Sequence, residues 1–178
     1  TLTTDGSGLP EWVPGKRGDA VRVSNTIDTY VDMGNPSALN VASAGTISAW
    51  IKMDSYSQWG AIAGKFNWGA DTNGYGLTMT TTAEVAGFYL ADGGGGDLLE
   101  TAPLDLNTWY HLTGTWDGVT ARLYVNGVDV ANAPQWATPT PATSSASAKS
   151  FADHALHRVL ERPAGPRPGA GFVMGSVC

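Results

Sequence analysis

The chain has 178 residues, of which 42% are hydrophobic and 15% are charged, so it is long enough for one domain with a sizeable core. Its net charge of −6 argues against nucleic acid as a partner, because binding to phosphates needs a basic face. No apolar run approaches the roughly 18 residues that a membrane-spanning helix needs, so no transmembrane segment is expected.

Short strands are predicted along the first half of the chain. Thr46–Met53 alternates Ile47, Ala49 and Ile51 with polar residues and Trp50, which is the period-two pattern of a strand. Short strands separated by Gly, Asn, Asp and Pro are typical of a β-sandwich or jelly roll. Five further segments have the same pattern: Ala20–Asn25, Thr29–Met33, Gly60–Phe66, Tyr75–Thr81 and Val85–Ala91.

Hairpins are predicted in the next two segments. Leu90–Glu100 contains four consecutive glycines, but the helix and lysine of a phosphate-binding loop are missing, so we expect a flexible hairpin loop. Leu106–Ala131 contains two turn signals, Asp117-Gly118 and Asn126-Gly127, and the second is the strongest signal for a two-residue hairpin. Three consecutive antiparallel strands are therefore predicted here.

The composition changes near residue 136. Residues 1–135 carry 14 acidic and 6 basic side chains, whereas residues 136–178 carry 2 acidic and 4 basic ones. We therefore expect a jelly-roll domain over 1–135 and an atypical C-terminal arm over 136–178. Within the arm we expect a linker over Ala137–Ala148, a short helix over Ser150–Arg162 and a last strand over Gly171–Cys178.

Three stretches of the chain resemble one family. The segments "GTWDG", "ARLYVNG" and "VDVA", in this order, resemble laminin-G-like and pentraxin-like domains, which are concanavalin A-like jelly rolls. Asp28–Lys52 and Trp12–Ser24 are similar to the first half of such domains. The resemblance covers about residues 5–134 and implies an all-β fold, an antiparallel β-sandwich.

The resemblance ends after Pro134, because the family's closing strand, of the type Gly-x-Ile-Asp-Glu-Val-x-Ile-Tyr, is missing. Either the C-terminal arm closes the sandwich in an unusual way, or a sheet edge stays open. An open edge, or the arm itself, can pair with a second copy as a homodimer. We expect a secreted or cell-surface location. The chain has a single cysteine, Cys178, so it has no internal disulfide that would indicate an oxidising compartment, and the lack of a disulfide does not exclude one.

Loop aromatics are the candidates for sugar binding, because flat rings stack on the C–H faces of pyranoses while amides and carboxylates hold the hydroxyls. Trp59 and Trp68 fall in predicted loops, and polar or aromatic neighbours accompany them. The predicted carbohydrate-binding residues are Trp59, Asn67, Trp68, Asp71, Asn73 and Tyr75. The alternative is that the loop tryptophans cap the open ends of the sandwich. Core packing is the preferred interpretation for three others: Trp50, Trp109 and Trp116.

Calcium is a candidate cofactor. The resemblance implies that Asp71 and Asn73 stand where pentraxin-like domains place an Asp-Asn calcium pair. Asp28 and Asp32 flank a predicted strand near Asn35, and the resemblance implies that laminin-G-like domains can hold a carboxylate ligand in this loop. The alternative is that these residues only form turns.

Catalysis is not expected. The Glu-x-Asp-x-x-Glu pattern that glycoside hydrolases of this fold place on one strand is missing, and no Ser-His-Asp or metal-histidine set is present. The sequence favours a non-catalytic module that binds a carbohydrate or glycoconjugate through its end loops. A module for protein interaction or self-association is the main alternative, and a polysaccharide-active enzyme comes third.

Overall fold

A computed structural model of the chain describes eleven stretches, and for some residues in them only the backbone. These stretches are 2–4, 11–23, 29–56, 58, 60–67, 73–80, 82, 84–92, 95–134, 147–149 and 158–161. The only helical element within them is the 3₁₀ turn η1, Ser37–Leu39. None of these residues belongs to a helix long and apolar enough to cross a membrane.

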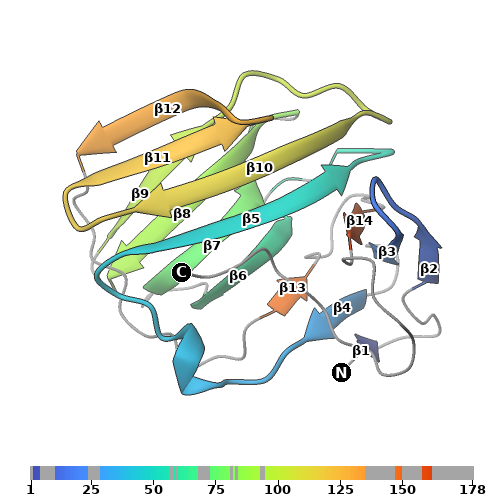
Figure 1. Ribbon diagram of the computed structural model, residues 1–178, viewed down its shortest axis with the longest axis horizontal. Coiled ribbons are helices and arrows are strands. Elements are labelled where there is room, and N and C mark those ends of the chain that lie inside the picture. The colour runs from blue at the N-terminus through green and yellow to red at the C-terminus, as the bar shows by residue number, and fades with distance from the viewer. Residues whose placement is uncertain are drawn as a thin grey trace.

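The described residues form three antiparallel sheets (Figure 1). The order is β1-β4-β13-β6-β7-β8-β9 in the largest, β12-β11-β10-β5 in the second and β14-β3-β2 in the third. The largest sheet contains β1 (Leu2–Thr4), β4 (Thr29–Asp32), β13 (Ser147–Lys149), β6 (Ala61–Asn67), β7 (Asn73–Met79), β8 (Ala86–Asp92) and β9 (Gly96–Glu100). The others contain β12 (Val128–Pro134), β11 (Thr120–Val125), β10 (Trp109–Trp116), β5 (Gly45–Lys52), β14 (Arg158–Glu161), β3 (Asp19–Val23) and β2 (Glu11–Pro14).

The predicted β-sandwich is confirmed, and each of the six strands predicted from alternation has a counterpart within a few residues. The three strands predicted over Leu106–Ala131 are β10, β11 and β12. Asn126 and Gly127 join the last two with φ of 53° and 82°, which is why a turn with positive φ at both central positions forms there. The Asn126 side chain also accepts a hydrogen bond from the His111 backbone N–H, at 2.9 Å.

The core lies between the seven-stranded and the four-stranded sheets. Its centre on the four-stranded side is Trp116, which is 2% exposed and packs against Tyr75 and Phe88 with ring centroids 4.9 and 5.9 Å away. The Trp116 indole N–H donates to the carbonyl of Ala42 at 3.2 Å. Gly114 lies under the Phe88 ring, where a Cβ would be 2.3 Å from a ring carbon. The two sheets are therefore closely packed.

The C-terminal residues enter the sheets. β13 lies between β4 and β6, so part of the segment expected to be a linker closes the large sheet. The helix predicted over Ser150–Arg162 is wrong at its end, because Arg158–Glu161 is strand β14, paired with β3. Val159 and Leu160 are compatible with a strand as well as with a helix. Pairing with β3 stabilises the strand conformation here. The rest of that prediction, and the strand expected over Gly171–Cys178, lie outside the described residues.

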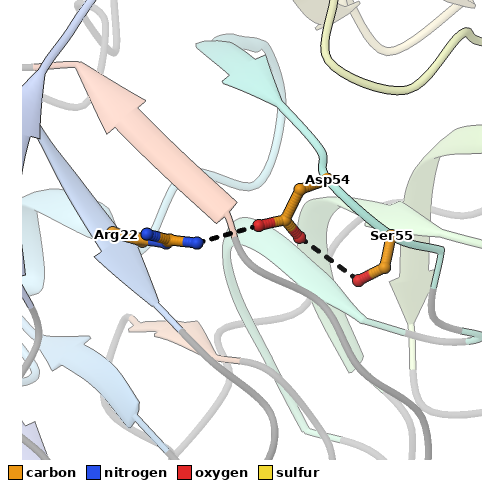
Figure 2. Close-up of polar contacts among 3 residues, drawn as sticks. All are labelled: Arg22, Asp54 and Ser55. Atoms are coloured by element: carbon orange, nitrogen blue, oxygen red, sulfur yellow. Dashed lines mark hydrogen bonds and ion pairs between the residues drawn. The ribbon is translucent and has the colours of Figure 1, made fainter.

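The third sheet lies beside the end of β5, and its strand β14 packs on β5 (Figure 1). Arg22 of β3 reaches Asp54, two residues beyond β5, with a distance of 3.1 Å between Nη2 and Oδ2 (Figure 2). Asp54 also accepts a hydrogen bond from the hydroxyl of Ser55, at 3.3 Å (Figure 2). The ion pair ties the β2–β3 hairpin to the main sandwich.

Candidate functional site

Polar residues meet at one end of the large sheet. Asn67 ends β6 opposite Asn73, which begins β7, and Asn73 is also opposite Asp92 at the end of β8. Asn67, Asn73 and Asp92 therefore form one row across three strands, and we call this end of the sandwich the hairpin end. Asp92 is exposed. The structure thus brings two predicted residues together and adds Asp92, which the sequence analysis did not single out.

Two predicted residues of this loop, Trp68 and Asp71, lie outside the described residues, and only the backbones of Asn67 and Asn73 are described. The close approach of β7 to β6 requires Gly74, the second residue of β7. This residue has a φ of 106°, and a Cβ there would be 2.0 Å from the Lys65 carbonyl oxygen. The glycine lets β7 start close against β6 and so fixes the register that aligns the polar row.

Tyr75 is not available as a sugar contact. Its side chain is 2% exposed, its ring packs on Trp116 and its hydroxyl donates to the Leu39 carbonyl at 2.9 Å. Burial raises the pKa of Tyr75. The prediction that this residue contacts a sugar is not supported by its position, because alternation along β7 directs Tyr75 and Leu77 into the core.

A buried lysine lies beside the hairpin end. Lys65 is 1% exposed, pairs with Tyr75 in register and donates a hydrogen bond from Nζ to the side-chain oxygen of Asn40. Burial lowers its pKa, since the apolar surroundings disfavour the charged form. Sequence reasoning missed Lys65 because a lysine in a strand pattern is ordinarily an outward-facing residue.

On the outer side of the same end, Tyr89 lies near two carboxylates. Its pKa is raised by burial and further by Asp92 and Asp97. A Cβ on Gly96 would lie 2.5 Å from the Tyr89 hydroxyl oxygen, so the phenol rests over this glycine. The hairpin end therefore presents a phenol and acidic groups beside the polar row.

Trp59, the other predicted loop tryptophan, lies outside the described residues. Gly60, which follows Trp59, directly precedes β6, and Asn67, which precedes Trp68, is the last residue of β6. A seven-residue strand is about 20 Å long. The connections that contain Trp59 and Trp68 thus leave the sheet at opposite ends, so we treat them as two separate candidate sites.

The calcium prediction concerns four residues, of which Asp28 and Asp71 are not described. Asp32 ends β4, where its backbone pairs with Ser147 of β13, and Asn73 begins β7. No three histidine, cysteine, aspartate or glutamate side chains gather in the part of the chain that the structure describes. Calcium binding stays a prediction.

A second aromatic surface lies on the outer face of the four-stranded sheet. Trp50 and Trp109 were expected in the core, but both are half-buried and alternate with inward residues such as Ile51. Trp50 stands opposite His111, with ring centroids 5.1 Å apart, and Nζ of Lys16 is 5.9 Å from the Trp50 ring. Burial lowers the pKa of His111, and Arg17 lowers it further. We call Lys16, Trp50, Trp109 and His111 the outer platform.

Residues 24–152 match a laminin G family model described as the concanavalin A-like lectin/glucanases superfamily. Solved structures with a similar fold include the binding domain of Paraclostridial mosquitocidal protein 1, with TM-score 0.62 and 16% identity over 92% of this chain and 45% of that one. The binding domain of botulinum neurotoxin DC in complex with SialylT has TM-score 0.62 and 12% identity over 90% of this chain and 41% of that one.

The carbohydrate-binding module CBM66 from Bacillus subtilis has TM-score 0.48 and 18% identity, over 88% of this chain and 91% of that one. No curated protein matches the chain in sequence. The chain spans less than half the length of the two toxin binding domains. The family match and the likeness to the two toxin binding domains establish the architecture.

Proposed function

Because the chain belongs to the concanavalin A-like lectin/glucanases superfamily, we propose that it is a non-catalytic module that binds a carbohydrate or glycoconjugate at the hairpin end. The observation that carries the proposal is the row of Asn67, Asn73 and Asp92, aligned by strand register. Amide and carboxylate groups hold sugar hydroxyls, and strand ends hold such groups more rigidly than loops do.

Within a superfamily named for both lectins and glucanases, the sequence favours binding. Hydrolysis of a glycosidic bond needs two carboxyl groups placed across it. The chain lacks the alternating Glu-x-Asp-x-x-Glu strand that supplies such carboxylates. The proposed ligand contacts are Asn67, Trp68, Asp71, Asn73 and Asp92.

A glycan array tests the proposal. We expect the unchanged protein to bind at least one glycan and Trp68→Ala to lower the affinity by about tenfold or more, as loss of a stacking ring does. Asp92→Asn, which keeps the side-chain size, is expected to weaken the same interaction. Trp12→Ala is the matched control, because this tryptophan is 37% exposed on β2, which belongs to the third sheet. The proposal fails if no glycan binds, or if binding is indifferent to both Trp68→Ala and Asp92→Asn.

Calcium forms part of this proposal as a cofactor held by Asp71 and Asn73, with Asp28 and Asp32 as a second place. A metal bound only by the native state must raise the melting temperature. The melting temperature is therefore expected to rise with calcium and to fall with a chelator. Equal melting temperatures in the two buffers would remove calcium from the proposal without affecting sugar binding.

Self-association is the second candidate, and the edge strand β12 favours it. Val128 is 64% exposed and Val130 is 43% exposed on this strand, which is last in its sheet. The register skips Val130 between Asp129 and Ala131, and because such a bulge disfavours backbone pairing along an edge, association would rest on the exposed valine side chains. Sedimentation of the protein and of Val128→Lys decides: a concentration-dependent dimer that the lysine abolishes supports self-association, and a strict monomer excludes it.

A further inference from the structure

One surface loop at the end of the sandwich is held by side chains of the core. This loop, residues 36–42, contains η1 and leads toward β5, and we call it the η1 loop. Side chains of β6, β7 and β10 donate three hydrogen bonds to it. The donors are Lys65, Tyr75 and Trp116, and the acceptors are the side-chain oxygen of Asn40 and the carbonyls of Leu39 and Ala42.

The η1 loop lies at the hairpin end. Trp116 contacts the ring of Tyr75 and is paired in register with Gly45, the first residue of β5. Lys65 is two residues before Asn67, the residue of the polar row that ends β6. Two residues of a strand span about 7 Å. The η1 loop is therefore close to the polar row of the proposed binding site.

The contact with Lys65 fixes which way the Asn40 amide points. An ammonium group only donates hydrogen bonds, so the oxygen of the amide must face Nζ and the nitrogen is turned away from it. Lys65 is 1% exposed, whereas Asn40 is exposed. Within the described part of the chain, no protein group accepts a hydrogen bond from the amide nitrogen of Asn40. Asn40 thus presents two N–H donors at the surface.

Lys65 is an expensive residue for this position. It follows in register with Tyr75 and Leu90 across three strands, and all three are buried in the sandwich. Among the described residues its hydrogen-bond partner is the neutral amide of Asn40 alone. A neutral amide compensates a buried cation less well than a carboxylate does, so an apolar residue would suit the core better. Orienting Asn40 is therefore the contribution that Lys65 makes.

We propose that Asn40 is a further ligand contact of the hairpin end, that Lys65 is its positioning residue, and that the two outward N–H groups select a sugar with an acetamido group. The proposal rests on the proposed function, because the site is the same. It adds a second wall, the η1 loop, to the row of Asn67, Asn73 and Asp92.

The chemistry of the outward group selects this class of sugar. An amide nitrogen only donates, so its complement is an oxygen that accepts. A sugar hydroxyl both donates and accepts and would suit other groups equally well, whereas an acetamido carbonyl only accepts. A sugar carboxylate would also accept. The chain has a net charge of −6, and Asp92 is exposed in the polar row, so an anionic sugar is disfavoured.

Calorimetric titration with chitotetraose, an oligosaccharide of N-acetylglucosamine, tests the role of Asn40. In Asn40→Asp the carboxylate still accepts from Lys65 but cannot donate to a ligand. We expect its affinity to be lower by about fivefold or more, as loss of a hydrogen bond produces, while the melting temperature does not fall. If Asn40 only held the loop, this variant would bind as well as the unchanged protein, because the contact with Lys65 persists.

Lys65→Met tests the positioning role. It keeps an unbranched stem and removes the N–H donors, so Asn40 loses its fixed orientation and the affinity should fall by a similar factor. The matched control is Asn107→Asp, the same change at an exposed asparagine that precedes the opposite end of β10, and it should leave the affinity within about twofold. The matched ligand is cellotetraose, which has a hydroxyl in place of each acetamido group and should bind about fivefold or more weakly.

The proposal is overturned if Asn40→Asp binds chitotetraose as well as the unchanged protein, if Asn107→Asp weakens binding equally, or if cellotetraose binds as tightly as chitotetraose. Full affinity in Lys65→Met would remove Lys65 as the positioning residue. If a glycan binds in a manner that depends on Asp92 and not on Asn40, the proposed function stands and this inference alone fails. If no glycan binds, both fail.

Discussion

The two faces of the four-stranded sheet use the same strands for different purposes. On the inner face, Trp116 is 2% exposed and Ile51 is 1% exposed, within one apolar cluster. On the outer face, Trp50 and His111 are half-buried and lie beside basic residues. Trp50 and Ile51 are adjacent in sequence, so the difference arises from strand alternation alone. Whether a tryptophan of this sheet lies in the core or on the surface therefore depends on its position in the strand alternation.

Truncating one tryptophan on each face tests this comparison most strongly. Trp116→Ala is expected to lower the free energy of unfolding by about 3–5 kcal/mol, because it leaves a cavity against Tyr75 and Phe88 and removes the hydrogen bond to Ala42. Trp50→Ala should cost about 1 kcal/mol or less, since it loses mainly a surface contact with Lys16 and His111. Urea unfolding of both variants gives the two values. Similar losses would mean that Trp50 belongs to the core after all.

A methyl group added to the inner face is the next largest test. Gly114→Ala would place a Cβ 2.3 Å from a Phe88 ring carbon, so the two sheets must shift apart. We expect a loss of about 1–3 kcal/mol in urea unfolding, as overpacking of a core costs.

Gly95→Ala is the matched control for this substitution. Nothing lies within 4 Å of a Cβ at that position, so the change should stay within about 0.5 kcal/mol. If both alanines were equally tolerated, the close packing between Gly114 and Phe88 would not hold in solution.

Much of the fold could be predicted from local sequence. Alternation in Thr46–Met53 and the Asn126-Gly127 turn each correspond to an element of the structure, because both signals act over a few residues. β13 and β14 could not be predicted in this way. Their pairing with β4, β6 and β3 depends on residues more than eighty positions away, and local periodicity in Ser150–Arg162 indicates a helix instead.

The candidate sites were less predictable. Alternation in Thr46–Met53 places Trp50 on the polar side of its strand, and the structure has it half-buried on the outer face, so the interpretation that this tryptophan packs in the core is not supported. The polar row at the hairpin end depends on register, which aligns Asp92 with Asn73 across 19 positions. Lys16 reaches the outer platform because the β2–β3 hairpin packs beside β5, and no residue pattern within the hairpin predicts that contact.

Breaking the ion pair between Arg22 and Asp54 tests how the outer platform is supported. The two side chains are 41% and 32% exposed, so Asp54→Asn should lower the free energy of unfolding by only about 0.2–1 kcal/mol, and less at high salt. Asp129→Asn, which breaks the pair with Arg122 within one hairpin, is the matched control. A loss of several kcal/mol from Asp54→Asn alone would show that this pair, more than the packing of β14 on β5, holds the β2–β3 hairpin on the sandwich.

The smallest expected effect is the pH response of the outer face of the four-stranded sheet, because His111, the one histidine among the described residues of this sheet, lies on that face. The pKa of His111 is lowered in the folded protein from its ordinary value of 6.5, first by burial and then by Arg17. The unfolded chain therefore binds the proton more tightly, so the contribution of His111 to stability is complete above about pH 7 and is lost as the pH falls through 6.5 toward its folded pKa. We expect the free energy of unfolding, measured by urea unfolding, to decrease from pH 7.5 to pH 5.5, and that of His111→Gln to decrease less over the same range.

The other two histidines, His154 and His157, are present in both proteins, so the difference between the two proteins reports the titration of His111. An equal decrease in the two proteins would place the imidazole in open solvent and would weaken the view of the outer platform as a preorganised surface.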